Sequence, residues 1–212
     1  DHEVFVVVMA PVCGPFGPLG QLNKHINPAS WQRSYEEVAP LAKFCGRVAM
    51  TQLHMGRHFI QEQPHPSKLY DEHPWPQVLS TRGVVQQTYD RCTCGLKVTR
   101  GQYKGFYIKK PSSMTASDYA LVMPFAHNKC TGQHQHIPDP RALGKREVYA
   151  DAEKWTWKEA SKVVDGILNV IAQEKRGNQR PHAYPIDITK IAKAQPGSYP
   201  APGRDYRAPK PQ

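Results

Sequence analysis

The chain has 212 residues, a formal net charge of +10 and 20 prolines, about twice the usual share of proline. Its length suits one domain with a hydrophobic core, and no apolar run approaches the ~18 residues that a membrane-spanning helix needs. Five cysteines, an odd number, argue against a secreted disulfide framework. They favour a reducing, intracellular compartment, either the nucleus or an organelle matrix.

A cysteine that follows a short apolar segment is the most informative residue. Residues 4–9, Val-Phe-Val-Val-Val-Met, predict a buried strand, and Cys13 lies in the loop after it. A second strand is predicted at 58–61, with Glu62 at its end. A helix between the strands predicts a right-handed crossover that brings both strand ends to one edge of the sheet. Cys13 and Glu62 are expected to face one pocket as nucleophile and acid; the alternatives are an inert buried thiol and a surface carboxylate.

The remaining elements follow from caps, prolines and periodicity. Asn-Pro at 27–28 predicts the start of the crossover helix, which Pro40 is expected to kink or split. A weaker strand is predicted at 83–87, and alternating turn and β-prone residues at 92–110 predict a hairpin. Thr-Trp-Lys-Glu at 156–159 is a capping box, and the apolar positions after it predict a long helix.

These elements predict an α/β fold: a mostly parallel sheet flanked by helices, incomplete at its N-terminal side. The domain is expected over 1–194, ending in a short helix at 186–194, and a basic, proline-rich extended tail follows at 195–212. Residues 175–212 carry eight Lys and Arg against two Asp. This asymmetry favours nucleic acid as a partner, the alternative being a solvated or protein-bound arm. A protein partner is expected to cover the incomplete sheet and to order the tail.

The order strand, Pro-x-Cys, helix, strand, Glu-x-Pro resembles the catalytic half of the C5-cytosine DNA methyltransferases. It is most similar to divergent versions from phages and from the polyproteins of protist retroelements. The resemblance extends to four later pieces: Cys92-Thr93-Cys94-Gly95-Leu96, Lys109-Lys110-Pro111-Ser112, Cys130-Thr131-Gly132-Gln133-His134-Gln135-His136 and Ala183-Tyr184-Pro185.

The resemblance implies a partial Rossmann-like methyltransferase fold in which Cys13 attacks C6 of an extruded cytosine and Glu62 holds N3. The chain has Pro-Val-Cys and Glu-Gln where the family usually has Pro-Pro-Cys and Glu-Asn. Only three residues precede the first strand, so S-adenosylmethionine is expected as cofactor only if an upstream segment exists. The expected function is a degenerate or truncated cytosine-5 methyltransferase-like domain associated with nucleic acid, inactive as an isolated chain. The alternative is a non-catalytic structural subunit of a large assembly, such as an organellar ribonucleoprotein.

Cysteines and histidines also gather in the region 92–136, with tight Cys-x-Cys and His-x-His spacings. They predict a structural zinc site, because thiolates and imidazoles are the ligands that zinc prefers. Gly132 allows a tight turn between two of the ligands, and Cys94 is left spare where the resembling sequences usually carry an aromatic residue. The alternative is a packed cysteine and histidines in a polar loop. The predicted ligands are Cys92, Cys130, His134 and His136.

Overall fold

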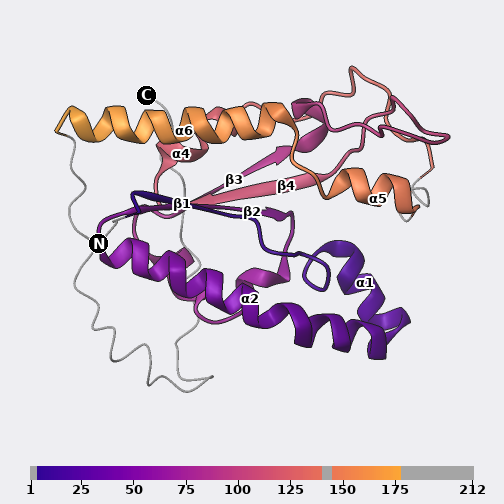
Figure 1. The fold of residues 1–212 in the computed structure, drawn as a ribbon, viewed down its shortest axis with the longest axis horizontal. Coiled ribbons are helices and arrows are strands. Elements are labelled where there is room, and N and C mark those ends of the chain that lie inside the picture. Colours follow the sequence, from indigo (N-terminus) through magenta and orange to yellow (C-terminus); the bar gives the residue numbers. More distant parts are fainter. Residues whose placement is uncertain (1–3, 140–144, 178–212) are drawn as a thin grey trace.

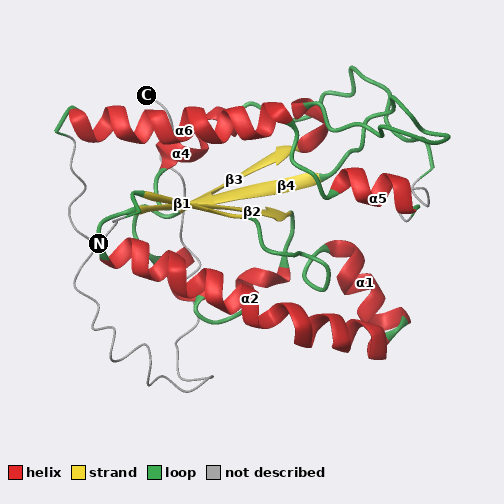
Figure 2. Cartoon of the chain, viewed as in Figure 1, coloured by secondary structure: helices red, strands yellow, loops and turns green. Residues whose placement is uncertain are grey.

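The computed structural model describes residues 4–139 and 145–177 (Figure 1). This part of the chain is α/β: a four-stranded open sheet lies between a long helix on one face and a second long helix on the other (Figure 2). The helix predicted at 186–194 and the tail predicted at 195–212 lie outside the described residues. Within those residues, no helix combines the length and apolarity needed to cross a bilayer.

The sheet is mixed, and its strands stand in the order β1-β2-β4-β3. β1 (Val6–Met9) pairs in parallel with β2 (His58–Pro64), as the crossover predicts. β4 (Pro111–Ala116) pairs antiparallel with β2 on one side and with β3 (Val85–Asp90) on the other. The prediction of a mostly parallel sheet is therefore wrong, since two of the three pairings are antiparallel.

The cause of this error is β4, a central strand that could not be predicted from its sequence. Pro-Ser-Ser-Met-Thr-Ala begins with proline and lacks a run of large apolar residues. Small hydroxyl residues nevertheless suit a position with sheet neighbours on both sides, and Ser112, Ser113 and Thr115 are fully buried. β1, β2 and β3 run in the same direction, but β4 separates β2 from β3 and reverses both pairings.

The crossover between β1 and β2 consists of two helices, α1 (Pro18–Ile26) and α2 (Pro28–His54). The Asn27 side chain caps α2 by accepting a hydrogen bond from the Ser30 backbone N–H at 3.2 Å. α2 continues through Pro40, so this proline does not divide the segment in two.

The core falls into three clusters. Phe59, Leu69 and Trp75 belong to the cluster between the sheet and α2, and Ile60 and Met114 to the one between the sheet and α6 (Trp157–Lys175). A third, smaller cluster lies under the segment between β3 and β4 and is formed by Leu96, Val98, Tyr103, Ile108 and Val148. The helices not yet placed are η1 (Lys68–Asp71), α3 (Trp75–Ser80), η2 (Arg91–Cys94), α4 (Tyr119–Val122), η3 (Met123–Phe125), α5 (Arg146–Ala152) and α6 (Trp157–Lys175).

The start of α6 is fixed by the predicted capping box. The Glu159 backbone N–H donates to the Thr156 hydroxyl at 3.1 Å, and the Thr156 N–H donates to the Glu159 carboxylate at 2.7 Å. Glu159 also receives the Arg91 guanidinium, and both side chains are almost fully buried. Arg91 donates further to the carbonyls of Ala152 and Lys154. This pair therefore joins the end of β3 to the turn between α5 and α6.

Candidate metal centre and cysteine–glutamate site

The four predicted zinc ligands come together. The ligand atoms of Cys92, Cys130, His134 and His136 all lie within 4.8 Å of one another. Cys130 Sγ is 3.6 Å from His134 Nε2 and 3.5 Å from His136 Nε2, and the two Nε2 atoms are 3.0 Å apart. Cys92 reaches the group from η2, whereas the other three residues follow η3 in the chain.

This spacing matches the coordination that zinc requires. Bonds of about 2.3 Å to sulfur and about 2.0–2.1 Å to nitrogen place tetrahedral ligand atoms about 3.3–3.8 Å apart. The three separations among Cys130, His134 and His136, 3.0–3.6 Å, are close to those values, and Cys92 Sγ lies within 4.8 Å of each of them. Two thiols and two imidazoles form a closed set of four ligands, which is typical of structural rather than catalytic zinc.

The neighbouring groups orient the ligands. The Gly132 N–H donates to Cys130 Sγ at 3.4 Å, and Gly132 has a φ of 81°, as a tight left-handed turn requires. The Cys130 N–H donates to the Asp90 carboxylate at 2.9 Å. The Tyr107 ring stacks on His134 with centroids 4.0 Å apart. Such partners hold metal ligands in fixed directions.

The protonation of the ligands depends on their burial. Burial raises the pKa of the Cys92 thiol to about 12, and the adjacent Cys130 thiol reinforces the shift. Burial also lowers the pKa of His136, assisted by His134 and Lys109, and so favours the neutral imidazole that binds metals. Cys94 instead packs in the core between the sheet and α6. It remains the spare thiol that the sequence predicts.

Cys13 and Glu62 lie at the same end of the β1–β2 pair. Cys13 follows β1 in a turn in which the Phe16 and Gly17 N–H groups donate to its carbonyl, each at 3.0 Å. Glu62 belongs to β2 itself rather than to a loop, and it is buried. One carboxylate oxygen of Glu62, Oε1, has no hydrogen-bond partner among the described residues.

The charges around Cys13 act in opposite directions. Burial raises the pKa of its thiol, Lys110 lowers that pKa, and the negative charges of Glu62 and Glu153 raise it. The net effect is upward, so the thiol form is favoured at neutral pH. Cys13 is therefore close enough to Glu62 and Lys110 to sense both charges, but it is not activated in the way of a low-pKa nucleophile.

Sequence reasoning missed Ser112, which stands near this carboxylate. The β2–β4 register pairs Pro64 with Ser112 and Glu62 with Met114, so Ser112 and Glu62 share a face of the sheet and are diagonal neighbours. Ser112 is fully buried, and its hydroxyl has no partner among the described residues. Only recognition of β4 as a strand would have revealed it.

The link between the two sites was also missed. Tyr89 and Arg91, at the end of β3, both donate to Glu159 of α6, the tyrosine hydroxyl at 3.1 Å. Glu62 contributes to raising the pKa of both groups, so it lies in the same electrostatic environment. Cys92 follows Arg91 directly. The metal cluster and the cysteine–glutamate site therefore flank one buried ionic network.

Comparisons with protein-family models, with curated proteins and with solved structures found no match to this chain. All five cysteines are free thiols, which is compatible with the reducing compartment predicted from their number. The function is therefore argued from the geometry of the two sites.

Proposed function

We propose that Cys92, Cys130, His134 and His136 bind one structural zinc ion that stabilises the region between β3 and α5. The observation that supports this most strongly is the convergence of the Cys92 thiol with three ligand atoms from the much later segment 130–136. The small cluster around Leu96, Val98 and Ile108 has few apolar residues with which to hold this region. A closed four-ligand site supplies folding free energy that such a cluster lacks.

Metal analysis tests this proposal directly. We expect about one zinc per chain in the purified protein and a lower melting temperature after chelation. Cys130→Ser should lose the metal, whereas Cys94→Ser should retain it because Cys94 lies outside the cluster. A metal content near zero in the unmodified protein, or an unchanged melting temperature after chelation, would remove the site.

For the domain as a whole we propose a degenerate or truncated cytosine-5 methyltransferase-like module that is associated with nucleic acid in the nucleus or an organelle matrix and does not transfer methyl groups as an isolated chain. Support comes from the parallel β1–β2 pair, which carries a thiol and a buried carboxylate with an unpartnered oxygen at one end. A cytosine must leave its duplex to reach such a pocket. Methyl transfer requires S-adenosylmethionine, for which we assign no binding residue.

The chemistry of this site begins when the Cys13 thiol passes its proton to the Glu62 carboxylate and the resulting thiolate adds to C6 of cytosine. As the S–C6 bond forms, the π electrons move through C5 and C4 to N3, which takes the Glu62 proton. C5 then gains a proton from water. The hydroxide left by that water takes the original C5 hydrogen as a proton, departure of the thiolate restores the ring, and the N3 proton returns through Glu62 to Cys13. This cycle needs no methyl donor.

Exchange of the cytosine C5 hydrogen with deuterated water therefore tests the site without any cofactor. A single-stranded oligonucleotide avoids the cost of opening a duplex. We expect slow exchange that Cys13→Ser abolishes and that Cys45→Ser leaves unchanged, because Cys45 is packed between α2 and the sheet. Failure of the unmodified protein to exchange would contradict a catalytic role.

A second candidate function, a non-catalytic subunit of a large assembly, is favoured by two observations. The raised pKa of Cys13 keeps its thiol protonated at neutral pH. In addition, β1 pairs only with β2 among the described strands, and Val8 of β1 is 46% exposed, as at a surface that a protein partner covers. This candidate predicts no exchange, and a Cys13→Ser variant that assembles normally.

A further inference from the structure

The segment that connects β3 to β4 forms a basic hairpin, which we define as residues 95–110. Lys97 and Tyr107 form an antiparallel bridge, and the Val98 N–H donates to the Phe106 carbonyl at 3.0 Å. The Ile108 N–H donates to the Leu96 carbonyl at 3.1 Å. The basic hairpin contains no acidic residue and five basic ones: Lys97, Arg100, Lys104, Lys109 and Lys110.

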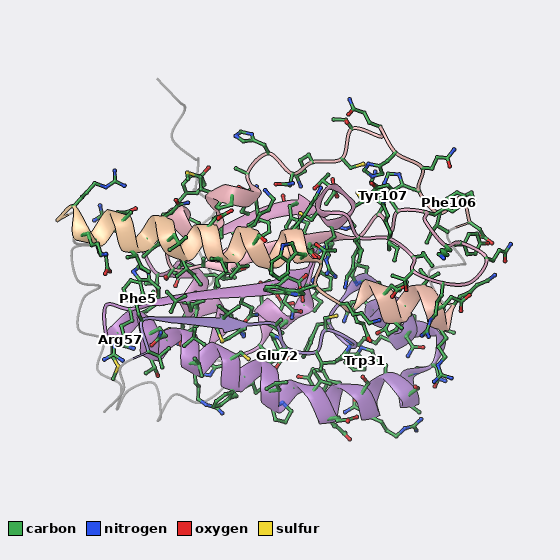
Figure 3. The ribbon with its side chains drawn as sticks, turned by 45° about the horizontal axis from the view of Figure 1, so that its top comes forward. Phe5, Trp31, Arg57, Glu72, Phe106 and Tyr107 are labelled. Atoms are coloured by element: carbon green, nitrogen blue, oxygen red, sulfur yellow. The ribbon has the colours of Figure 1, made fainter. Side chains whose placement is uncertain are left out.

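Four of these cations, all except Lys110, are exposed. None of the four takes part in an ion pair recorded among the described residues; Lys97 instead lies over the Tyr107 ring, 4.3 Å from its centroid. Figure 3 shows the labelled residues Phe106 and Tyr107 on this hairpin, at the end of the molecule where α5 and the N-terminal end of α6 lie. The charges of the four exposed cations are therefore available to bind an anion from solution.

The nearby carboxylates do not neutralise this surface. Asp151 accepts two bonds from Thr99, from its N–H at 2.8 Å and from its hydroxyl, and a contact from Lys154. Asp90 accepts from the Cys130 N–H below the metal cluster. Glu147 is a carboxylate at the tip, where it lies against Gly101.

The metal cluster forms the base of the hairpin. The Tyr107 N–H donates to the Gln135 carbonyl at 2.9 Å, and the Ile137 N–H donates to the Tyr107 carbonyl at 3.1 Å. Tyr107 also stacks on His134. The segment that carries His134 and His136 thus pairs with the C-terminal arm of the basic hairpin. A bound metal would fix the cations in space before any partner arrives, which lowers the entropic cost of binding.

We propose that the basic hairpin binds the phosphate backbone of a nucleic acid, with the metal centre as its rigid base. Exposed cations that are not held in ion pairs are the electrostatic footprint of a phosphate-binding surface. The hairpin ends at Lys110, which acts on the Cys13 thiol. The hairpin continues directly into β4, whose Ser112 is a diagonal neighbour of Glu62, so its base lies next to the cysteine–glutamate site. The inference rests on the proposed metal centre and names the element that binds the proposed nucleic-acid substrate.

Fluorescence anisotropy with a labelled 20-base-pair DNA duplex, measured at several salt concentrations, tests this surface in the full chain. The triple variant Lys97→Gln, Arg100→Gln, Lys104→Gln should weaken binding at least about tenfold at low salt and reduce the salt slope by about 3. The control variant Arg33→Gln, Arg47→Gln, Arg82→Gln removes the same charge from exposed positions on α2 and after α3. It should bind within about twofold of the unmodified protein.

Each outcome bears on a different part of the inference. An equal loss of DNA affinity in the two triple variants would show that binding depends on overall charge, and would overturn the proposal. If the hairpin substitutions weaken binding to phosphatidylserine vesicles more than binding to DNA, the partner is a membrane surface and the proposal is overturned too. If the protein binds zinc but the hairpin substitutions leave its DNA affinity unchanged, the metal centre is supported and the DNA-binding surface is contradicted. If the protein contains no metal and the hairpin variant still loses DNA binding, the binding surface is supported and the role of the metal as its rigid base is contradicted.

Discussion

The Cys13 thiol is subject to opposing charges from Lys110 and Glu62, so its rate of alkylation should depend on both. Burial raises its pKa, Lys110 lowers it and Glu62 raises it. Lys110→Gln should therefore raise the pKa further and slow alkylation by iodoacetamide at pH 8, whereas Glu62→Gln should lower the pKa and speed alkylation. In the unmodified protein the rate should rise with pH above neutrality. Peptide mass spectrometry measures the Cys13 rate separately from the other thiols.

Lys110→Arg is the matched control for this experiment, because it keeps the positive charge that acts on Cys13. The alkylation rate of Cys45, in the core beside α2, should not change in any of the variants. A shift of the Cys13 rate in the same direction for Lys110→Gln and Glu62→Gln would contradict the assignment of these charges.

The buried carboxylate of Glu159 is the second residue whose environment predicts a measurable effect. It accepts hydrogen bonds from Arg91, Tyr89 and the Thr156 N–H. Glu159→Gln leaves the Arg91 guanidinium without a counter-ion, so we expect a loss of about 3–5 kcal/mol in the free energy of unfolding. Urea denaturation monitored by circular dichroism measures it.

Asp71→Asn provides the comparison for Glu159, because the Lys68–Asp71 pair is exposed on both sides. That substitution should cost less than about 1 kcal/mol. A loss for Glu159→Gln as small as that of Asp71→Asn would show that the buried network contributes little to stability.

At the scale of elements, the contact between α4 and α6 depends on the absence of a side chain at Gly166. A Cβ built there would lie 2.1 Å from the Leu121 carbonyl oxygen and 3.0 Å from its Cα. Gly166→Ala must therefore push α6 away from α4, at a cost of about 1–3 kcal/mol. Ser161→Ala, at a half-exposed position of the same helix, should change stability by less than about 0.5 kcal/mol. Thermal unfolding of the two variants gives the comparison, and equal melting temperatures would contradict it.

Elements whose sequences carry their own caps or apolar runs were predictable. The Thr156–Glu159 box announced α6, and the run at 4–9 announced β1 together with the position of Cys13. β4 was not predictable, because its burial comes from neighbours on both sides rather than from its own hydrophobicity. Because β4 was not predicted, Ser112 was not recognised as a site residue; only the β2–β4 register places it near Glu62.

The candidate metal centre was predictable because the identities of its ligands carry the signal. Cysteine and histidine at short spacing indicate zinc without any knowledge of the fold. The Arg91–Glu159 pair had no such signal, since 68 residues separate its members and charged side chains are expected at the surface. The pairing of Cys13 with Glu62 followed from the crossover rule alone, and its catalytic meaning stays a prediction.

At the scale of the whole molecule, the metal region has a core of its own. The cluster around Leu96, Val98 and Ile108 is separate from the two clusters that sandwich the sheet. Removal of the metal should therefore unfold this region locally and leave the sheet intact. Hydrogen exchange should show faster exchange at 95–110 and 130–137 after chelation, with β2 and β4 still protected. Uniform loss of protection across the chain would instead make the metal essential to the entire fold.

The register that sets Asp90 opposite Pro111 has a consequence for how such a chain diverges or is redesigned. The backbone leaves the sheet and returns to it at facing positions, so strand pairing does not depend on what lies between. Closing a longer or shorter insert changes the free energy of folding by only about 0.6 kcal/mol per doubling of length. Exposed positions of the tip, such as Arg100, Gln102 and Lys104, can thus be exchanged for new binding residues while Val98 and Tyr103 keep their places in the third core cluster.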